Sequence, residues 1–242
     1  MRDYKKEFKD RVKWIKKVLK DSHMKGIVYG NSGGKDSALV GILCKAACDN
    51  TLGVLMPCSS KRNFGEDTED GKAVAEKFGI ETITIDLTDV RKSMVEVLLE
   101  QISEASLTNI APRLRMTTLY AIAQSKNMLV AGTGNRDEIY VGYYTKWGDG
   151  SSDFNPIADL TVGEIYEFLT YLEAPEHIIN KAPSAGLFEG QTDEGEMGIK
   201  YSDIDKYLLT GEGDADVIKK IENMHKKSEH KRAGVLMYGT EE

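Results

Sequence analysis

A glycine-rich segment near the N-terminus has the residue types and spacing of an anion-binding loop. It reads YGNSGGKDS over residues 29–37 and lies between a short apolar run, Ile27 to Tyr29, and a helical pattern over 39–47. Adjacent glycines let several backbone N–H groups converge, and the start of the following helix adds the positive end of its dipole. The sequence therefore predicts a phosphate-binding loop between a strand and a helix.

Two common nucleotide-binding motifs do not fit this segment. A Walker A loop needs glycine where Tyr29 stands and Ser or Thr where Asp36 stands. The Rossmann fingerprint fails at the Gly-Thr-Gly run over 132–134, because Asp137 takes the place of the third glycine. The remaining pattern, Ser-Gly-Gly-x-Asp-Ser, resembles the pyrophosphatase loop of adenylating enzymes, which split ATP between its α and β phosphates.

The aspartate of this loop suits a metal ion. A carboxylate among triphosphate oxygens is repelled unless Mg²⁺ lies between them, so Asp36 is predicted to be a metal ligand. The alternative is a glycine-rich turn in which Asp36 only caps the helix. The resemblance implies that ATP contacts Gly30, Asn31, Ser32, Gly33, Gly34, Lys35, Asp36 and Ser37.

Several further segments make the chain similar to the ammonia-dependent NAD⁺ synthetases. Their order and the gaps between them match that family as well. The similarity runs from about Gly26 to Arg232, nearly the whole chain. The segments are GTGNRDE at 132–138, GYYTKWGDG at 142–150, DFNPI at 153–157, KAPSAGL at 181–187 and GQTDE at 190–194.

The resemblance implies roles for single residues. Glu138 is a second Mg²⁺ ligand, and Thr133 and Ser184 contact ATP. The less favoured alternative for Glu138 is an exposed acid at a helix start, and without the resemblance Thr133 reads only as a turn residue. The dinucleotide substrate carries two phosphates and a carboxylate, so its site needs cations. The implied substrate contacts are Arg113, Lys146, Asp153, His230 and Lys231.

At two positions the assignment of ATP or substrate contacts remains open. Many relatives have an ATP-contacting lysine where this chain has Val162, so that contact is absent or comes from Lys35 or Lys181. Arg115 lies two residues after Arg113, on another part of the same helix, and is the less favoured arginine for the substrate.

Composition and charge exclude several classes of protein. The 242 residues hold 32 Lys and Arg against 39 Asp and Glu, a net charge of −7, which argues against the basic field of a nucleic-acid binder. No run approaches the ~20 apolar residues of a membrane span, and the lysine-rich N-terminus is unlike a secretory signal, so we expect a cytoplasmic protein.

The three cysteines, Cys44, Cys48 and Cys58, suit neither a disulfide framework nor a zinc site. The length predicts one domain over 1–242, without room for an appended glutaminase.

The hydrophobic pattern predicts the elements that hold these residues. Apolar runs and helical periodicities alternate along the chain, which indicates an α/β fold with a doubly wound, mostly parallel sheet and helices on both faces. The segment over 182–198 lacks periodicity and is predicted to be a loop that covers the site. Predicted strands are 27–29, 52–56, 81–87 and 127–131; predicted helices are 4–19, 39–47, 67–78, 89–99, 112–126, 161–172, a short one from 175, and 214–232; a long loop spans 142–154.

The resemblance implies an ATP-dependent amidation of deamido-NAD⁺ with free ammonia, through an adenylate, which releases AMP and pyrophosphate. It also implies a homodimer. The sequence leaves bulk solvent, Asp153 and Asp193 unranked as acceptors of the ammonia proton. Two alternatives are a tRNA-modifying ATP pyrophosphatase, which needs a basic RNA surface that is not evident here, and a non-catalytic adenine-nucleotide sensor.

Overall fold

Four parallel strands form the centre of the computed structural model, which describes residues 2–58, 64–98, 102–181, 192–235 and 237–238. Their order across the sheet is β3-β2-β1-β4. In the register, Val28 lies opposite Leu52 on one side and Val130 on the other. The strands are β1 Gly26–Gly30, β2 Thr51–Leu55, β3 Glu81–Thr84 and β4 Met128–Ala131.

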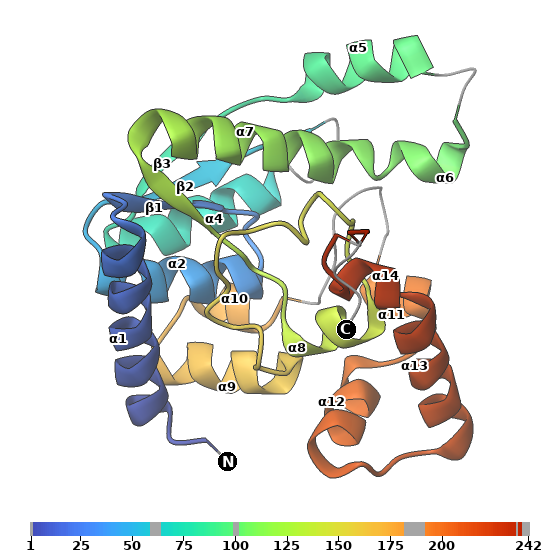
Figure 1. Cartoon of the computed structure of the whole chain (residues 1–242). Coiled ribbons are helices and arrows are strands. Elements are labelled where there is room, and N and C mark those ends of the chain that lie inside the picture. The colour runs from blue at the N-terminus through green and yellow to red at the C-terminus, as the bar shows by residue number, and fades with distance from the viewer. Residues whose placement is uncertain (1, 59–63, 99–101, 182–191, 236, 239–242) are drawn as a thin grey trace.

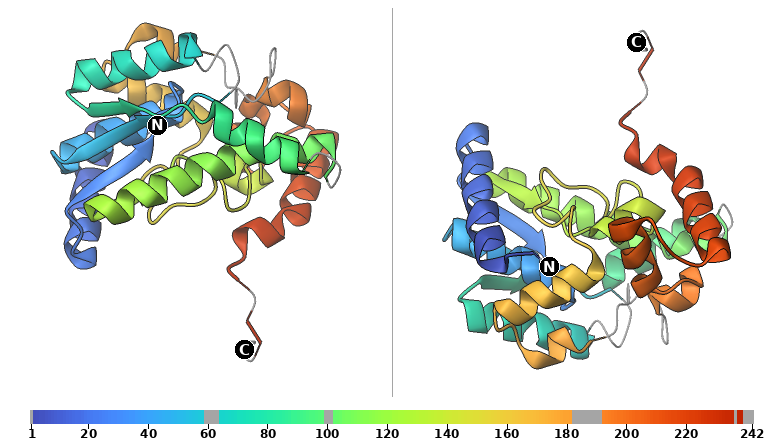
Figure 2. Two further views of the ribbon diagram at one scale, coloured as in Figure 1. Left: turned by 90° about the horizontal axis from the view of Figure 1, so that it is seen from above. Right: turned by 90° about the horizontal axis from the view of Figure 1, so that it is seen from below.

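Helices cover both faces of this sheet, as the alternation of elements predicts (Figures 1 and 2). Ile27 and Tyr29 of β1 pack into the cluster made with α1, α2 and α9, whereas Val28 points to the cluster made with α7. The helices are α1 Tyr4–Ser22, α2 Lys35–Ala47, α4 Glu66–Phe78, α5 Thr88–Leu98, α6 Glu104–Leu107, α7 Ile110–Lys126, α8 Arg136–Val141, α9 Val162–Tyr171, α10 Glu176–Ile179, α11 Asp193–Met197, α12 Tyr201–Thr210, α13 Ala215–Lys227 and α14 Glu229–Arg232.

Local signals in the sequence account for several helix boundaries. Thr161 and Glu164 form both hydrogen bonds of a capping box at the start of α9. Gly79 ends α4 in the left-handed conformation, with φ of 64°. The predicted doubly wound α/β fold is confirmed, and the three cysteines are free thiols. Among the described residues, no helix is long and apolar enough to cross a membrane.

Three expectations need correction. Residues 182–198 are not wholly without secondary structure, because Asp193–Met197 forms α11, which is too short to show periodicity and is started by the Thr192 side chain on the N–H of Gly195. The helix predicted over 214–232 ends at Ser228, and the chain continues as α14. The strand predicted over 81–87 is β3 only as far as Thr84.

Residues 182–191 lie outside the described part of the chain, and with them the predicted ATP contact Ser184.

Tyr29 lies fully buried in β1, and among the described residues none forms a hydrogen bond with its hydroxyl. A Cβ at position 41 would lie 2.3 Å from this hydroxyl, so the ring packs directly on the backbone of α2 at Gly41. Burial raises the pKa of Tyr29. A buried hydroxyl without a partner destabilises the folded state because its hydration is lost.

We therefore predict that Tyr29→Phe raises the free energy of unfolding by about 1 kcal/mol. Urea titration of the two proteins measures this difference. Tyr4→Phe is the matched control, because the Tyr4 hydroxyl donates a hydrogen bond to Glu167 over 2.7 Å and its loss gives no gain in stability. A Tyr29→Phe protein less stable than the wild type would show that the hydroxyl is satisfied.

Candidate functional site

The predicted phosphate loop joins β1 to α2 and is held in shape by its own side chains. Gly33 has φ of 72°, and a Cβ there would lie 2.1 Å from the carbonyl oxygen of Asp67, so only glycine fits. The Asn31 amide donates to the carbonyl of Gly71 over 2.9 Å, which ties the loop to α4. The first N–H groups of α2 have no acceptor within the helix, so this loop presents donors to an anion.

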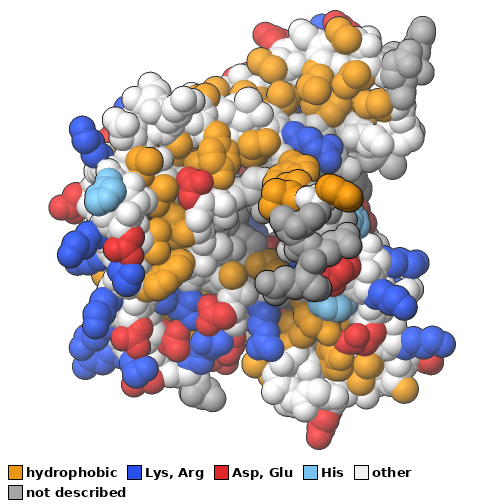
Figure 3. Space-filling view, viewed as in Figure 1, with side chains coloured by type: hydrophobic (Ala, Val, Ile, Leu, Met, Phe, Trp, Pro, Cys, Tyr) orange, Lys and Arg blue, Asp and Glu red, His pale blue; other side chains and the backbone are white. Residues whose placement is uncertain are grey.

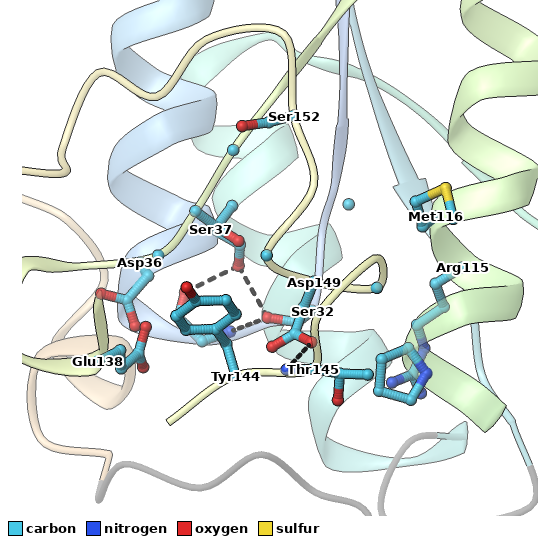
Figure 4. A pocket seen from close by; sticks show the side chains of 18 of the residues that line it. Ser32, Asp36, Ser37, Arg115, Met116, Glu138, Tyr144, Thr145, Asp149 and Ser152 are labelled. Atoms are coloured by element: carbon cyan, nitrogen blue, oxygen red, sulfur yellow. Dashed lines mark hydrogen bonds between the residues drawn. The ribbon is translucent and has the colours of Figure 1, made fainter. Parts of the chain in front are cut away.

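A cleft of about 810 Å³ opens at the carboxyl ends of the strands, where parallel α/β sheets place their ligands (Figure 4). The loops after β1 and β4 meet there, because these strands are neighbours in the sheet. Predicted ATP residues that line this cleft are Gly30, Asn31, Ser32, Gly34, Lys35, Asp36, Ser37 and Thr133.

The two predicted metal ligands lie together in this cleft (Figure 4). Asn135 connects them, since its amide donates to Asp36 Oδ1 over 3.2 Å and its side-chain oxygen accepts from the N–H of Glu138 over 3.0 Å. Glu138 completes a capping box by accepting from the N–H of Asn135. Burial and the negative charge of Asp36 raise the pKa of Glu138 well above its usual value. The arrangement therefore attracts a cation.

These two acids fit Mg²⁺ bound together with phosphate. Mg²⁺ is usually held by one or two carboxylates, waters and substrate phosphates rather than by a complete protein cage. In the described residues, no group of three or more His, Cys, Asp or Glu side chains forms such a cage. Asp36 and Glu138 beside a phosphate loop supply the carboxylate part of the set.

Lys35 and Lys181 bring positive charge to the loop. The Lys35 ammonium lies 2.7 Å from Asp36 Oδ2. Although burial alone lowers its pKa, the charges of Asp36 and Glu138 raise it. Lys181 is 2.8 Å from Asp67 Oδ1 and 2.5 Å from Asp70 Oδ2, and it donates to the carbonyl of Gly33 over 3.4 Å. Both candidates for the missing lysine contact therefore lie at the loop.

The predicted dinucleotide contacts divide into two groups. Lys231 lines the cleft and donates to the carbonyls of Gly142 and Tyr144, each over 2.6 Å, and burial lowers its pKa. Outside the cleft lining, Arg113 donates to the carbonyl of Lys146 over 3.3 Å, and Lys146 donates to the carbonyl of His230. These three residues lie next to one another although they are far apart in the sequence.

Two residues do not lie where the sequence analysis expected them. The Asp153 carboxylate lies outside the cleft lining and accepts from the N–H of Val130 over 2.7 Å and from the hydroxyl of Tyr120 over 3.3 Å. Arg115, the less favoured arginine, lines the cleft and donates to the carbonyl of Met56 over 3.1 Å, whereas Arg113 does not line it. Residues two apart on a helix face different directions, so only one of the two arginines points inward.

The sequence did not identify Asn135 as a site residue. Its signal was the spacing Asn-x-x-Glu after the apolar run of β4, which predicts a helix cap beside the acid. Tyr201 was also missed: its hydroxyl donates to Asp193 Oδ2 over 3.2 Å, and Asp193 lines the cleft. No pattern in the sequence connects Tyr201 with the loop after β1.

Two neighbouring carboxyl groups, one of them buried, lie behind the helix that carries Glu138. Asp137 of α8 is fully buried and accepts from the N–H of Val162 over 2.6 Å, while Asp205 accepts from the N–H of Gly163 over 2.8 Å. Burial and the neighbouring Asp205 carboxyl raise the pKa of Asp137 to about 9. Through these bonds the two acids join α8 and α12 to the start of α9.

Comparison with known proteins agrees with this geometry. A family model described as NAD synthase matches residues 7–234. An NH(3)-dependent NAD(+) synthetase of Carboxydothermus hydrogenoformans is 48% identical over 226 residues, which are 91% of this chain and 92% of that relative.

Solved structures of similar proteins match almost the whole chain. An NMN synthetase from Francisella tularensis is 34% identical with a TM-score of 0.93, and the match covers 99% of this chain and 100% of that one. An NH3-dependent NAD synthetase from Campylobacter jejuni, solved with a nitrate ion, is 32% identical with a TM-score of 0.80, and the match covers 98% and 99% of the two chains.

The buried acids of α8 predict a pH dependence of stability. Asp137 has its pKa raised to about 9 in the folded protein, against about 4 in an unfolded chain. Between these values the folded state binds more protons, so the free energy of unfolding falls as the pH rises. Glu138, with its raised pKa, contributes in the same direction.

Urea titrations of the ligand-free protein at pH 6, 7.5 and 9 measure this loss. We expect Asp205→Asn to reduce it, because an amide that donates to Asp137 favours its ionised form. The control is Asp203→Asn, an exposed position on the same helix, which should leave the slope unchanged. Equal slopes for wild type and Asp205→Asn would contradict the effect of the Asp205 carboxyl on Asp137.

Proposed function

The chain belongs to the NAD synthase family, and on this premise we propose how its cleft joins ATP cleavage to amide formation. It is an ammonia-dependent ligase of NAD biosynthesis. The observation that carries the proposal is the Asp36–Asn135–Glu138 group beside the phosphate loop. The substrate carboxylate would attack the α phosphorus of ATP, pyrophosphate would leave into the loop, and ammonia would replace AMP on the adenylate.

The loop and α2 hold the triphosphate. Backbone N–H groups at the start of α2 and the hydroxyls of Ser32 and Ser37 face the leaving pyrophosphate. Asp36 and Glu138 would hold Mg²⁺, which neutralises charge on the leaving pyrophosphate when bound. Lys181 touches the loop at Gly33 and adds positive charge at its edge.

Asp193 is our choice for the proton acceptor of ammonia. It is buried in the cleft lining, where Tyr201 and Tyr143 hold its carboxylate by hydrogen bonds of 3.2 and 3.4 Å. A base must lie within reach of the proton that it takes. Asp153 lies outside the cleft lining, so it is the weaker candidate.

The length of the substrate is a second question that one comparison raises. The Francisella tularensis relative, named an NMN synthetase, has a TM-score of 0.93, against 0.80 for the Campylobacter jejuni NAD synthetase. A mononucleotide that ends in the same nicotinate carboxylate needs the same adenylation and the same amide step. Deamido-NAD⁺ remains our first choice, since the NH(3)-dependent NAD(+) synthetase of Carboxydothermus hydrogenoformans is 48% identical.

The test is a set of incubations with Mg·ATP in which NAD⁺, AMP and pyrophosphate are measured together. Deamido-NAD⁺ with ammonium should give the three products in equal amounts, and glutamine in place of ammonium should give none. Nicotinate mononucleotide should react with a lower kcat/KM. Formation of ADP, or intact ATP, would contradict the adenylation step, and faster reaction of the mononucleotide would reverse the order of substrates.

Loss of either metal-binding acid should abolish this reaction without unfolding the protein. We predict that Asp36→Asn and Glu138→Gln each lower kcat by at least ~100-fold, because charge on the leaving pyrophosphate is no longer compensated. Glu69→Gln removes one exposed acid of α4 and should retain full activity. Thermal unfolding verifies that each variant is folded. Near wild-type turnover by either variant would remove that residue from the mechanism.

We also propose a homodimer through α5. No residue of Thr88–Leu98 is buried, and this helix exposes Val90, Met94 and Val97 by 52%, 43% and 80%. Figure 3 shows hydrophobic side chains gathered over α5. An exposed apolar patch of this kind marks an interaction surface, and a symmetric pair of chains is the commonest way to cover one.

Val97→Asp should therefore convert a dimer to a monomer. Light scattering coupled to size exclusion measures the mass at several concentrations. The control is Leu209→Asp on α12, which is 52% exposed and lies outside the proposed surface. A wild-type monomer at every concentration, or a Val97→Asp dimer, would contradict the proposal.

A further inference from the structure

Lys35 is buried at the first position of α2, with 6% of its surface exposed. Its ammonium is 2.7 Å from Asp36 Oδ2. The rings of Tyr201 and Tyr166 lie with their centroids 5.6 and 6.0 Å from the same nitrogen. Aromatic faces attract a cation, so these two rings and the carboxylate hold the ammonium in one place.

The ammonium of Lys35 pairs with a carboxylate oxygen of Asp36 that a divalent ion would bind. Oδ2 of Asp36 is paired with Lys35, and Oδ1 accepts from the amide of Asn135 over 3.2 Å. Each oxygen of Asp36 therefore already has one partner in the ligand-free protein. A divalent ion that binds Asp36 must displace the Lys35 ammonium from Oδ2 or lie close to it, and repulsion by the ammonium disfavours both arrangements until a ligand adds further negative charge.

We propose that Lys35 is a positioning residue that serves as the resident cation of the Asp36–Glu138 pair and makes entry of the divalent ion depend on the triphosphate. The inference rests on the proposed function only for the assignment of these acids as metal ligands. The phosphate oxygens of ATP add the negative charge and the further ligands that outweigh repulsion by Lys35. The two acids do not form a complete cage for a metal by themselves, which is consistent with this dependence.

The Lys35–Asp36 ion pair affects the order in which Mg²⁺ and ATP bind. Mg²⁺ alone should bind the site weakly, and Mg·ATP should bind as one unit. Lys35 keeps the Asp36 carboxylate oriented toward the cleft until then, because the ion pair and the Asn135 bond hold both of its oxygens. Removal of the ammonium should leave two neighbouring carboxylates that repel each other and attract any divalent ion.

Binding of Mn²⁺ to the ligand-free protein, measured by electron paramagnetic resonance of the free ion, tests this dependence. We expect weak binding by the wild type and at least ~10-fold tighter binding by Lys35→Met, which removes the charge and keeps the length of the side chain. Lys35→Arg retains the charge and should stay weak. Lys45→Met removes a lysine from the other end of the same helix and should bind Mn²⁺ as the wild type does.

A double variant locates the ion. Glu138→Gln added to Lys35→Met should abolish the tighter binding, and its persistence would mean that the ion binds elsewhere and would overturn the proposal. The wild type provides a test that requires no variant to fold, because tight binding of Mn²⁺ without nucleotide refutes the proposal directly. The readout is metal affinity, so the result is independent of whether the chain makes NAD⁺.

Discussion

The proposed site depends on one electrostatic constraint: two carboxylates must lie beside a loop whose N–H groups suit phosphate oxygens. Two acids, Asp36 and Glu138, lie after neighbouring strands, and burial together with the charge of Asp36 raises the pKa of Glu138. The fold compensates the repulsion between them with groups that bind both acids in the absence of metal. Asn135 hydrogen-bonds to both, and Lys35 pairs with Asp36. The polar contacts of the cleft thus set the position of these carboxylates before any ligand arrives.

The sheet order makes that meeting possible. β1 and β4 are neighbours although about a hundred residues separate them, and parallel pairing puts the loops after both strands at one edge. The C-terminal helices close the cleft from the side, where Ser228 packs against Gly142 so closely that a Cβ at 142 would lie 2.1 Å from the Cβ of Ser228. Contacts across the whole chain therefore determine the position of a few charged atoms.

Elements with a strong local signal were predicted from the sequence, and contacts between distant elements were not. The strand, glycine loop and helix around Asp36 follow from apolar runs and turn chemistry, and the resemblance paired Glu138 with it as a second metal ligand. The sequence ranked Arg113 above Arg115, yet Arg115 lines the cleft, because the direction of a side chain depends on how α7 packs on the sheet. The bond from Asn135 to Asp36 joins residues 99 apart, and the bond from Tyr201 to Asp193 joins two short helices, so the sequence alone predicted neither contact.

In a chain with a net charge of −7, the cations of the cleft are held in two different ways. Lys35 and Lys181 pair with carboxylates, so part of their charge is already compensated near the loop. Lys231 and Arg115 donate to backbone carbonyls, which orient a cation without cancelling its charge. The first arrangement suits phosphates that arrive with a metal ion, and the second suits the anionic groups of a substrate that arrives without one. Local placement of charge, rather than its sum over the chain, therefore decides what the cleft attracts.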